Sequence, residues 1–194
     1  IFKNKIYCKV HYIRMSIHLI SGCMFSGKTS ELINVAKMQC ILNKNVLIIN
    51  FDGDTRYSEN TKIMTHDSIS FDCLPCGKDL LFFIKENKQY KNADVVCINE
   101  GQFFDKLVDF CLGACNEGKD VYVCGLDGDY LKRPFGEILN LIPHCETVTK
   151  KRALCMGCKD GTLASFTKKL INSDNLVEIG STDIYMPVCR KCYN

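Results

Sequence analysis

The sequence predicts an α/β fold, a parallel sheet with helices on both faces, followed by a small cysteine-rich module. Apolar runs of strand length alternate with helical patterns over most of the chain, and this alternation is typical of parallel sheets. A glycine-rich turn stands between the first strand and the first helix. Two Cys-x-x-Cys pairs near the end of the chain mark the module.

The individual elements follow from the spacing of apolar residues. Leu32, Val35, Ala36 and Cys40 recur at helical spacing. The Val-Leu-Ile-Ile and Val-Val-Cys-Ile runs are apolar throughout, as in strands buried on both faces. The prediction is, in chain order, strand 17–21, helix 28–42, strand 45–51, helix 79–88, strand 94–99, helix 104–117, strand 121–126 and short strands at 147–148 and 163–167.

Composition excludes several classes of protein. Of 194 residues, 46% are hydrophobic and 24% charged, which excludes intrinsic disorder as the main state. No apolar run approaches the roughly 20 residues of a membrane span, so no membrane partner is expected. A net charge of +3 without a long run of one sign gives no electrostatic case for a nucleic-acid partner. The 14 cysteines, without an apolar signal segment, predict reduced thiols in a cytoplasmic protein.

The domain prediction has three parts. Residues 1–15 are expected to be a non-native or disordered extension, because Met15 directly precedes the first clear strand. The alternative is a short ordered edge strand over residues 6–13. Residues 16–145 are expected to form the nucleotide-binding α/β domain. Residues 146–194 are expected to form the second domain, packed tightly on the first because no flexible linker separates them.

Residues 22–29 fit the phosphate-binding pattern G-x-x-x-x-G-K-[ST]. The glycines let the backbone wrap around phosphates, and the N–H groups of the loop and the helix N-terminus supply positive charge. Lys28 can then reach the β- and γ-phosphates, and Thr29 can hold Mg²⁺. The strand–turn–helix setting therefore predicts a P-loop domain that binds a nucleoside triphosphate. Its expected ATP- and Mg²⁺-binding residues are Gly22, Met24, Phe25, Ser26, Gly27, Lys28 and Thr29.

Three further sets of residues are candidates for the site. Glu100 directly follows an apolar strand, where a carboxylate can hold Mg²⁺ or accept a proton; the alternative is an acid that stabilises a helix N-terminus. Arg56, in the loop after the second strand, can stabilise phosphoryl charge or lie on the surface. Leu126, Tyr130 and Phe135 can form a flat apolar slot for a nucleobase, or pack in the core.

Four cysteines predict a metal site. Cys155, Cys158, Cys189 and Cys192 form two Cys-x-x-Cys pairs, the complement of a closed structural Zn²⁺ site; the alternative is four ordinary reduced thiols. A third pair, Cys73 and Cys76, has no second pair to complete such a site, and no function is expected there.

The ordered set of motifs resembles the type II thymidine kinases, the cytosolic and large-DNA-virus kind. The resemblance covers residues 17–193 and rests on Met24-Phe25-Ser26-Gly27-Lys28, Asp54-Thr55-Arg56-Tyr57, Thr65-His66-Asp67, Glu100-Gly101-Gln102-Phe103-Phe104, Leu126-Asp127-Gly128, Arg133-Pro134-Phe135-Gly136, Cys155-Met156-x-Cys158 and Val188-Cys189-Arg190-Lys191-Cys192-Tyr193. It implies ATP-dependent phosphorylation of the 5′-hydroxyl of thymidine, and of deoxyuridine. It also implies a zinc-held lasso domain over the nucleoside, a homotetramer, and inhibition by the triphosphate end product.

The resemblance also implies residue roles. Glu100 corresponds to the general base, Lys28 and Arg56 to groups that stabilise phosphoryl charge, and Thr29 to a Mg²⁺ ligand. Thr167 corresponds to a residue near the thymine methyl group, and Tyr185 to the lasso tyrosine. The implied nucleoside-binding set is Met24, Phe103, Leu126, Tyr130, Phe135, Thr167, Val177, Ile179, Gly180 and Tyr185.

One departure from the family pattern bears on catalysis. Asn99 stands where the family usually has an Asp that acts on Mg²⁺. An amide keeps the carbonyl oxygen but loses the charge, so we expect weaker Mg²⁺ binding in an active enzyme. The alternatives are a catalytically weak nucleotide-binding protein of the same fold, or another P-loop NTPase with a zinc module. Tyr130, in place of a more usual Phe, bears on nucleoside selectivity.

Overall fold

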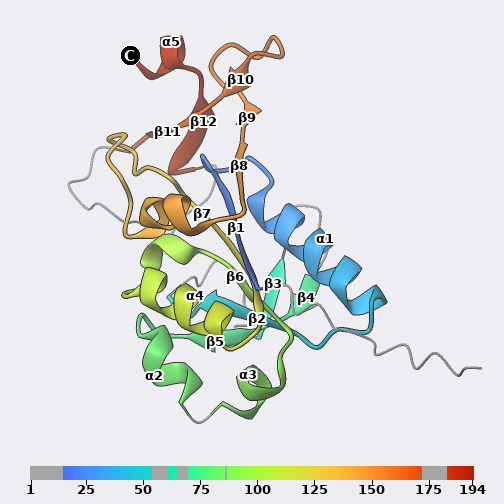
Figure 1. The fold of residues 1–194 in the computed structure, drawn as a ribbon. Helices are drawn as coiled ribbons and strands as arrows, with labels where there is room; N and C mark the ends of the chain where they lie inside the picture. Colours follow the sequence, from blue (N-terminus) through green and yellow to red (C-terminus); the bar gives the residue numbers. More distant parts are fainter. Residues whose placement is uncertain (1–14, 54–60, 65–69, 86, 172–182) are drawn as a thin grey trace, which may run out of the picture.

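A six-stranded parallel sheet forms the centre of the molecule (Figure 1). The computed structural model describes residues 15–53, 61–64, 70–85, 87–171 and 183–194. The sheet has the order β5-β2-β6-β7-β1-β8, and every pairing in it is parallel. The strands are β1 (Ser16–Gly22), β2 (Val46–Phe51), β5 (Leu74–Cys76), β6 (Val95–Ile98), β7 (Asp120–Gly125) and β8 (Thr147–Lys151). The predicted α/β class is confirmed.

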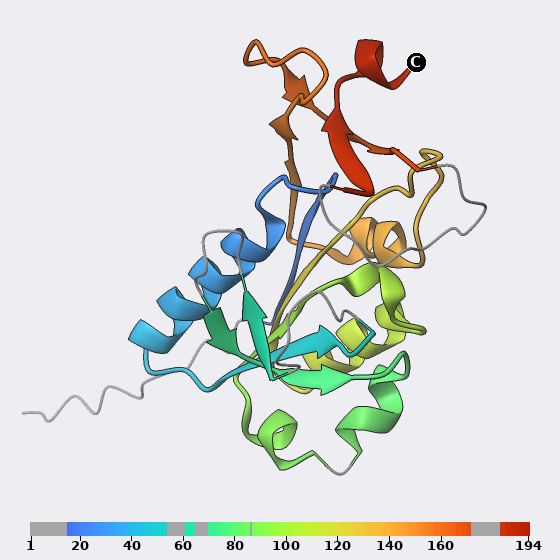
Figure 2. The same cartoon turned by 180° about the vertical axis from the view of Figure 1, so that it is seen from behind.

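Helices cover the two faces of the sheet because the central strands are apolar on both sides (Figures 1 and 2). On one face, Leu32, Ile33 and Ala36 of α1 (Lys28–Ile41) pack on alternate strand residues such as Ile48 and Cys97. The other face is covered by α2 (Leu80–Ile84), α3 (Lys88–Asn92), α4 (Leu107–Asn116) and the 3₁₀ helix η2 (Ile138–His144). The apolar residues that face the helices on each side of the sheet are buried, and this fixes the register of the central strands.

The cysteine-rich module consists of small antiparallel pairs above one end of the sheet (Figure 2). Strand β9 (Ala153–Leu154) pairs with β10 (Leu163–Ala164), and β11 (Phe166–Lys169) pairs with β12 (Tyr185–Val188). The short helix α5 (Arg190–Tyr193) follows. A further hairpin, β3 (Lys62–Met64) and β4 (Ser70–Asp72), lies beside the sheet.

Two predicted helices differ in their extent. The helix expected over 79–88 ends at Ile84, and a second helix begins at Lys88. The side chains of Asp79 and Asn87 accept hydrogen bonds from Phe82 N–H and Tyr90 N–H, and each starts a new helix. The helix expected over 104–117 begins at Leu107, since the chain first forms a 3₁₀ turn, η1 (Gly101–Phe103).

The segment after the predicted domain boundary at 145/146 begins with β8, which is longer than the short strand expected at 147–148. Residues of β8 pair with β1 from His18–Thr147 to Gly22–Lys151, so this segment is the edge strand of the main sheet. Its side chains from Thr147 to Lys150 are exposed, and no apolar run marks it as part of the sheet. The extension expected over residues 1–15, and the alternative strand over 6–13, lie outside the described residues except for Met15. In the described part of the chain, no helix has the length and apolar character needed to cross a membrane.

Gly22 lies where the phosphate loop meets the edge strand β8, and a substitution there tests this contact. Its φ is 146°, and a Cβ there would overlap the carbonyl oxygen of Lys151 on β8. We expect Gly22→Ala to lower the free energy of unfolding by about 2 kcal/mol or more, from backbone strain and overlap. Urea unfolding of the purified protein measures this change.

Gly113→Ala is the matched control. Gly113 lies inside α4, and a Cβ there meets no atom within 4 Å. The added methyl group should raise the free energy of unfolding by about 0.5–1 kcal/mol through helix propensity. Equal changes in the two variants would contradict the special role of Gly22.

Candidate active site and zinc centre

The phosphate loop turns sharply between β1 and α1. Phe25 and Gly27 adopt left-handed backbone angles (φ 62° and 78°), and Gly27 caps α1 without a side-chain hydrogen bond. Ser26 Oγ and Lys28 Nζ each donate to the carbonyl oxygen of Cys23 at 2.8 Å. The loop thus presents N–H groups and a lysine at a helix N-terminus, the arrangement that binds phosphate.

Lys28 is the buried charge of the site. Its side chain is buried against the loop, and burial lowers its pKa, while the nearby charge of Glu100 opposes the shift. A buried ammonium group is strongly attracted to anions. The lysine is therefore placed to attract a polyphosphate as well as the Glu100 carboxylate.

Asn99 joins three elements through its side-chain amide. Its Oδ1 accepts hydrogen bonds from Thr29 Oγ1 at 3.2 Å and from the Cys124 thiol at 3.0 Å. Its Nδ2 donates to Asn50 Oδ1 at 2.8 Å. Thr29 and Asn99 thus bring two oxygen atoms together at the carboxyl end of β6, and hard oxygen donors of this kind fit Mg²⁺.

Glu100 is held at the turn after β6. Its φ is 56°, and its Oε2 accepts a hydrogen bond from Gln102 Nε2 at 2.7 Å. Gln102 Oε1 in turn accepts from Leu126 N–H at 2.9 Å, so one buried amide links the carboxylate to the loop after β7. Gln102 lies in the Glu100–Phe104 motif, but the sequence alone predicts no role for it.

Aromatic side chains lie next to this carboxylate. The Phe103 ring stacks on Phe51 at 4.8 Å between centroids and meets Phe135 edge-on at 5.4 Å. The structure therefore brings together the predicted residues Phe103 and Phe135. It adds Phe51, the last residue of β2, which the sequence predicts only as part of the strand over 45–51.

The segment 126–136, which we call the β7 loop, is organised by Asp129. The Asp129 carboxylate accepts hydrogen bonds from Leu131 N–H and Arg133 N–H and pairs with the Arg133 guanidinium at 2.8 Å. At the end of the loop, Gly136 has a φ of 58°, and a Cβ there would overlap the carbonyl oxygen of Gln102. Leu126, Tyr130 and Phe135 are thereby held in one loop.

The cysteine-rich module contacts the phosphate loop directly. Thr167 Oγ1 accepts a hydrogen bond from Met24 N–H at 3.0 Å, and the Cys23 thiol donates to the carbonyl oxygen of Ala164 at 3.5 Å. Thr167, a predicted site residue, is therefore bonded to the backbone of Met24, another predicted site residue. Tyr185 is buried and pairs with Lys169 between β11 and β12.

Four predicted site residues lie outside the described residues, namely Arg56, Val177, Ile179 and Gly180. The motif residues 54–57 and 65–67 lie there too. Their roles remain predictions from the resemblance.

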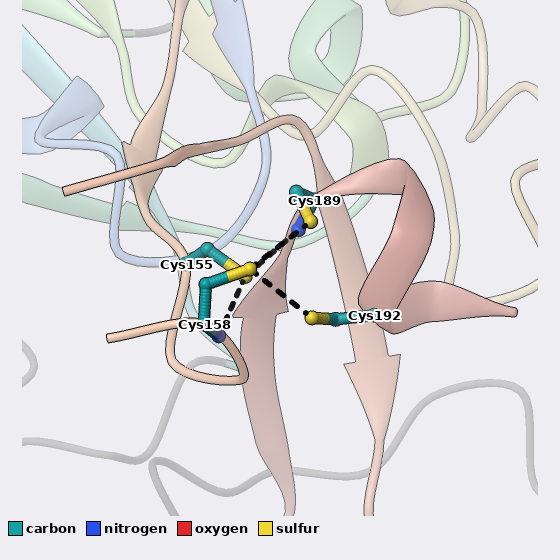
Figure 3. A group of neighbouring side chains, drawn as sticks. All are labelled: Cys155, Cys158, Cys189 and Cys192. Carbon is teal, nitrogen blue, oxygen red and sulfur yellow. Dashed lines mark hydrogen bonds between the residues drawn. The ribbon is translucent and has the colours of Figure 1, made fainter. Parts of the chain in front are cut away.

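The four predicted cysteines come together (Figure 3). Their sulfur atoms lie within 4.8 Å of one another, with Cys158 Sγ 3.6 Å from Cys189 Sγ and 3.4 Å from Cys192 Sγ. Four thiolates around Zn²⁺ at about 2.3 Å would stand roughly 3.8 Å apart, so the group fits a zinc ion. Although burial opposes it, N–H donors of Cys189 and Cys158 lower the pKa of Cys155 to about 6, and this favours the thiolate that zinc needs.

Cys73 and Cys76 have a different setting. Both side chains are buried, and burial raises the pKa of Cys73 to about 11 and that of Cys76 to about 12. Thiols of such high pKa are poor nucleophiles, which agrees with the prediction of no function for this pair.

A family model described as thymidine kinase matches residues 15–193, nearly all of the chain. The chain belongs to the thymidine kinase family. Thymidine kinase 1 of Dictyostelium discoideum is 40% identical over 95% of this chain and 80% of its own length. Thymidine kinase of vaccinia virus (strain Western Reserve) is 42% identical over 91% of this chain and 96% of its own.

A plant relative extends the comparison. Thymidine kinase a of Arabidopsis thaliana is 43% identical over 92% of this chain and 74% of its own length. The comparisons confirm the resemblance that the ordered motifs indicated. Thymidine kinases are phosphotransferases that use ATP, so the phosphate loop has its expected place in the family.

The zinc centre gives a direct prediction. We expect the purified protein to hold about one zinc ion per chain, and Cys158→Ser to lose it, because three thiolates and a hydroxyl bind zinc far more weakly. Cys40→Ser, at an exposed thiol of α1, should keep the metal. Elemental analysis and the thermal midpoint of each variant measure the effect. Full zinc content in Cys158→Ser would contradict the assignment.

Proposed function

We propose that this chain transfers the γ-phosphoryl group of ATP to the 5′-hydroxyl of thymidine, and of deoxyuridine, in nucleotide salvage. The observation that carries the proposal is the position of Glu100, a carboxylate fixed by Gln102 between the phosphate loop and the Phe51–Phe103–Phe135 cluster. Family membership supports the same reaction. The homotetramer and the cytoplasmic location, without nucleic-acid or membrane partners, belong to the same proposal.

The proposed reaction needs a base and a set of positive groups. Glu100 accepts the proton of the 5′-hydroxyl as that oxygen attacks the γ-phosphorus; the new P–O bond forms as the bond to the bridging oxygen breaks, and ADP leaves. Lys28 and Arg56 neutralise the charge on the transferring group. Thr29 and Asn99 would hold Mg²⁺, which when bound supplies further charge neutralisation on the phosphates.

The proposed nucleoside pocket joins both modules. Phe103, Phe135, Leu126, Tyr130 and Met24 supply its apolar walls. Thr167, with its hydroxyl on the Met24 backbone, closes the pocket from the zinc module. The remaining proposed contacts come from the lasso segment, Val177, Ile179, Gly180 and Tyr185.

A catalytically weak nucleotide-binding protein is the second candidate. It is favoured by Asn99, which is neutral and whose amide is already bonded to Thr29, Cys124 and Asn50. An enzyme and a binding protein differ in one observable. Only the enzyme releases ADP faster when thymidine is added to ATP and Mg²⁺.

Glu100→Gln tests the base. We expect thymidine-dependent ADP release by the wild-type protein, with deoxycytidine as the nucleoside control. The variant should lower kcat about 100-fold or more, because an amide cannot accept the hydroxyl proton. Glu117→Gln, on the exposed end of α4, should leave kcat unchanged. A kcat of Glu100→Gln within about threefold of wild type would exclude Glu100 as the base.

Asn99→Asp tests whether the neutral side chain at position 99 weakens Mg²⁺ binding. A carboxylate binds Mg²⁺ more strongly than an amide, so the Mg²⁺ concentration at half-maximal rate should fall several-fold. Direct titration of the ATP-bound protein with Mg²⁺ provides a readout independent of turnover. Asn116→Asp, at the end of α4, is the matched control. If the Mg²⁺ curves of Asn99→Asp and wild type coincide, the neutral side chain does not set the metal requirement.

A further inference from the structure

The last zinc ligand and the β7 loop are joined by one residue. Cys192 lies in the short helix α5, and Tyr193 follows it directly. The Tyr193 hydroxyl donates a hydrogen bond to the carbonyl oxygen of Tyr130 at 2.6 Å. Tyr130 stands in the middle of the β7 loop, 63 residues earlier in the chain. The contact therefore runs from the zinc centre to the loop that carries the proposed nucleobase residues.

Tyr193 is itself held from several sides. Its ring meets Phe166 of β11 edge-on at 5.9 Å between centroids, and Lys132 Nζ of the β7 loop lies 3.9 Å from the ring centre. Lys168 Nζ donates to the carbonyl oxygens of Cys192 and Tyr193 at 3.0 and 3.1 Å. A cation over an aromatic face and a charge-assisted hydrogen bond both restrict the ring. The hydroxyl of Tyr193 thus has a fixed direction.

The β7 loop has few other anchors at its tip. Asp129 organises the loop internally. Its start is fixed by Gln102 through Leu126 N–H and by an ion pair of Asp127 with Lys150 of β8 at 2.7 Å. At the tip, Leu131 is 47% exposed, so burial does not hold this part in place. Lys132 has a φ of 63°, an unfavourable backbone angle for lysine. Contacts with the zinc module therefore determine where the tip lies.

We propose that Tyr193 is a positioning residue for the nucleoside site, which transmits the order of the zinc centre to the β7 loop. The inference rests on the proposed function, since it takes Leu126, Tyr130 and Phe135 as nucleoside contacts. It makes the zinc centre more than a stabiliser of its own module. Nucleoside affinity depends on the Tyr193 hydroxyl, whereas ATP binding and the chemical step do not.

Tyr193→Phe removes the hydroxyl and keeps the ring. A hydrogen bond to a neutral carbonyl contributes about 2- to 10-fold in an equilibrium constant, so the KM for thymidine should rise about 3- to 10-fold. The kcat at saturating thymidine and the KM for ATP should stay within about twofold, and the zinc content should stay at the wild-type value. Tyr90→Phe, under α4 and remote from the β7 loop, is the matched control and should change none of these values.

Hydrogen exchange separates failure of this inference from failure of the proposed function. In the zinc-loaded protein without nucleoside, Tyr193→Phe should speed amide exchange in residues 126–136 at least several-fold, with exchange in α4 unchanged. Unchanged exchange in 126–136 would overturn the inference, whether or not the wild-type protein is a kinase. An unchanged KM for thymidine, or equal changes in kcat and in both KM values, would overturn it too. If the wild-type protein shows no thymidine-dependent turnover, only the proposed function is refuted. The exchange data then still decide whether Tyr193 positions the β7 loop.

Discussion

The buried amide of Gln102 is the interaction on which the arrangement of the site depends. Its nitrogen donates to Glu100 and its oxygen accepts from Leu126 N–H, so one side chain fixes both the carboxylate after β6 and the loop after β7. A side-chain amide can donate and accept at once, which a carboxylate cannot do. The backbone of Gly136 closes over the same residue, where any larger residue would overlap it. Gln102 therefore fixes the position of the Glu100 carboxylate relative to the β7 loop.

The cysteine-rich module connects the phosphate loop to the β7 loop. Thr167 accepts from Met24 N–H, and Cys23 packs in one small core with Ala164, Val188 and the metal cysteines. The module is too small to be stable through its core alone, so a bound metal would supply much of its order. Its hydrogen bonds at Met24, Cys23 and Tyr130 reach both the phosphate loop and the β7 loop. The cysteine cluster, the phosphate loop and the β7 loop thus form one connected unit.

Sequence patterns predicted the sheet, α1 and the cysteine cluster because each has a strong local signal. Four buried residues in a row mark β6, and the spacing of two Cys-x-x-Cys pairs marks a metal site. Strand β8 was predicted only as a short strand at 147–148 in the second domain, since its exposed and mostly polar side chains carry no such signal, and its pairing with β1 defines its full extent. Gln102, Phe51 and Tyr193 could not be predicted as neighbours of the site for a similar reason. Their partners Leu126, Phe103 and Tyr130 are distant in the chain, and no periodicity encodes such contacts.

Asn99 shows why a departure from the family pattern is compatible with the fold. The site already holds a buried ammonium, Lys28, beside one carboxylate, Glu100, and these charges offset each other. A second carboxylate at position 99 would add a negative charge to this group, which the neutral amide does not. The amide accepts from Thr29 and Cys124 while it donates to Asn50, so both the oxygen and the nitrogen of the Asn99 side chain have partners. The chain thus loses a negative charge at the proposed metal position and keeps a neutral amide that joins α1, β2 and β7 through three hydrogen bonds.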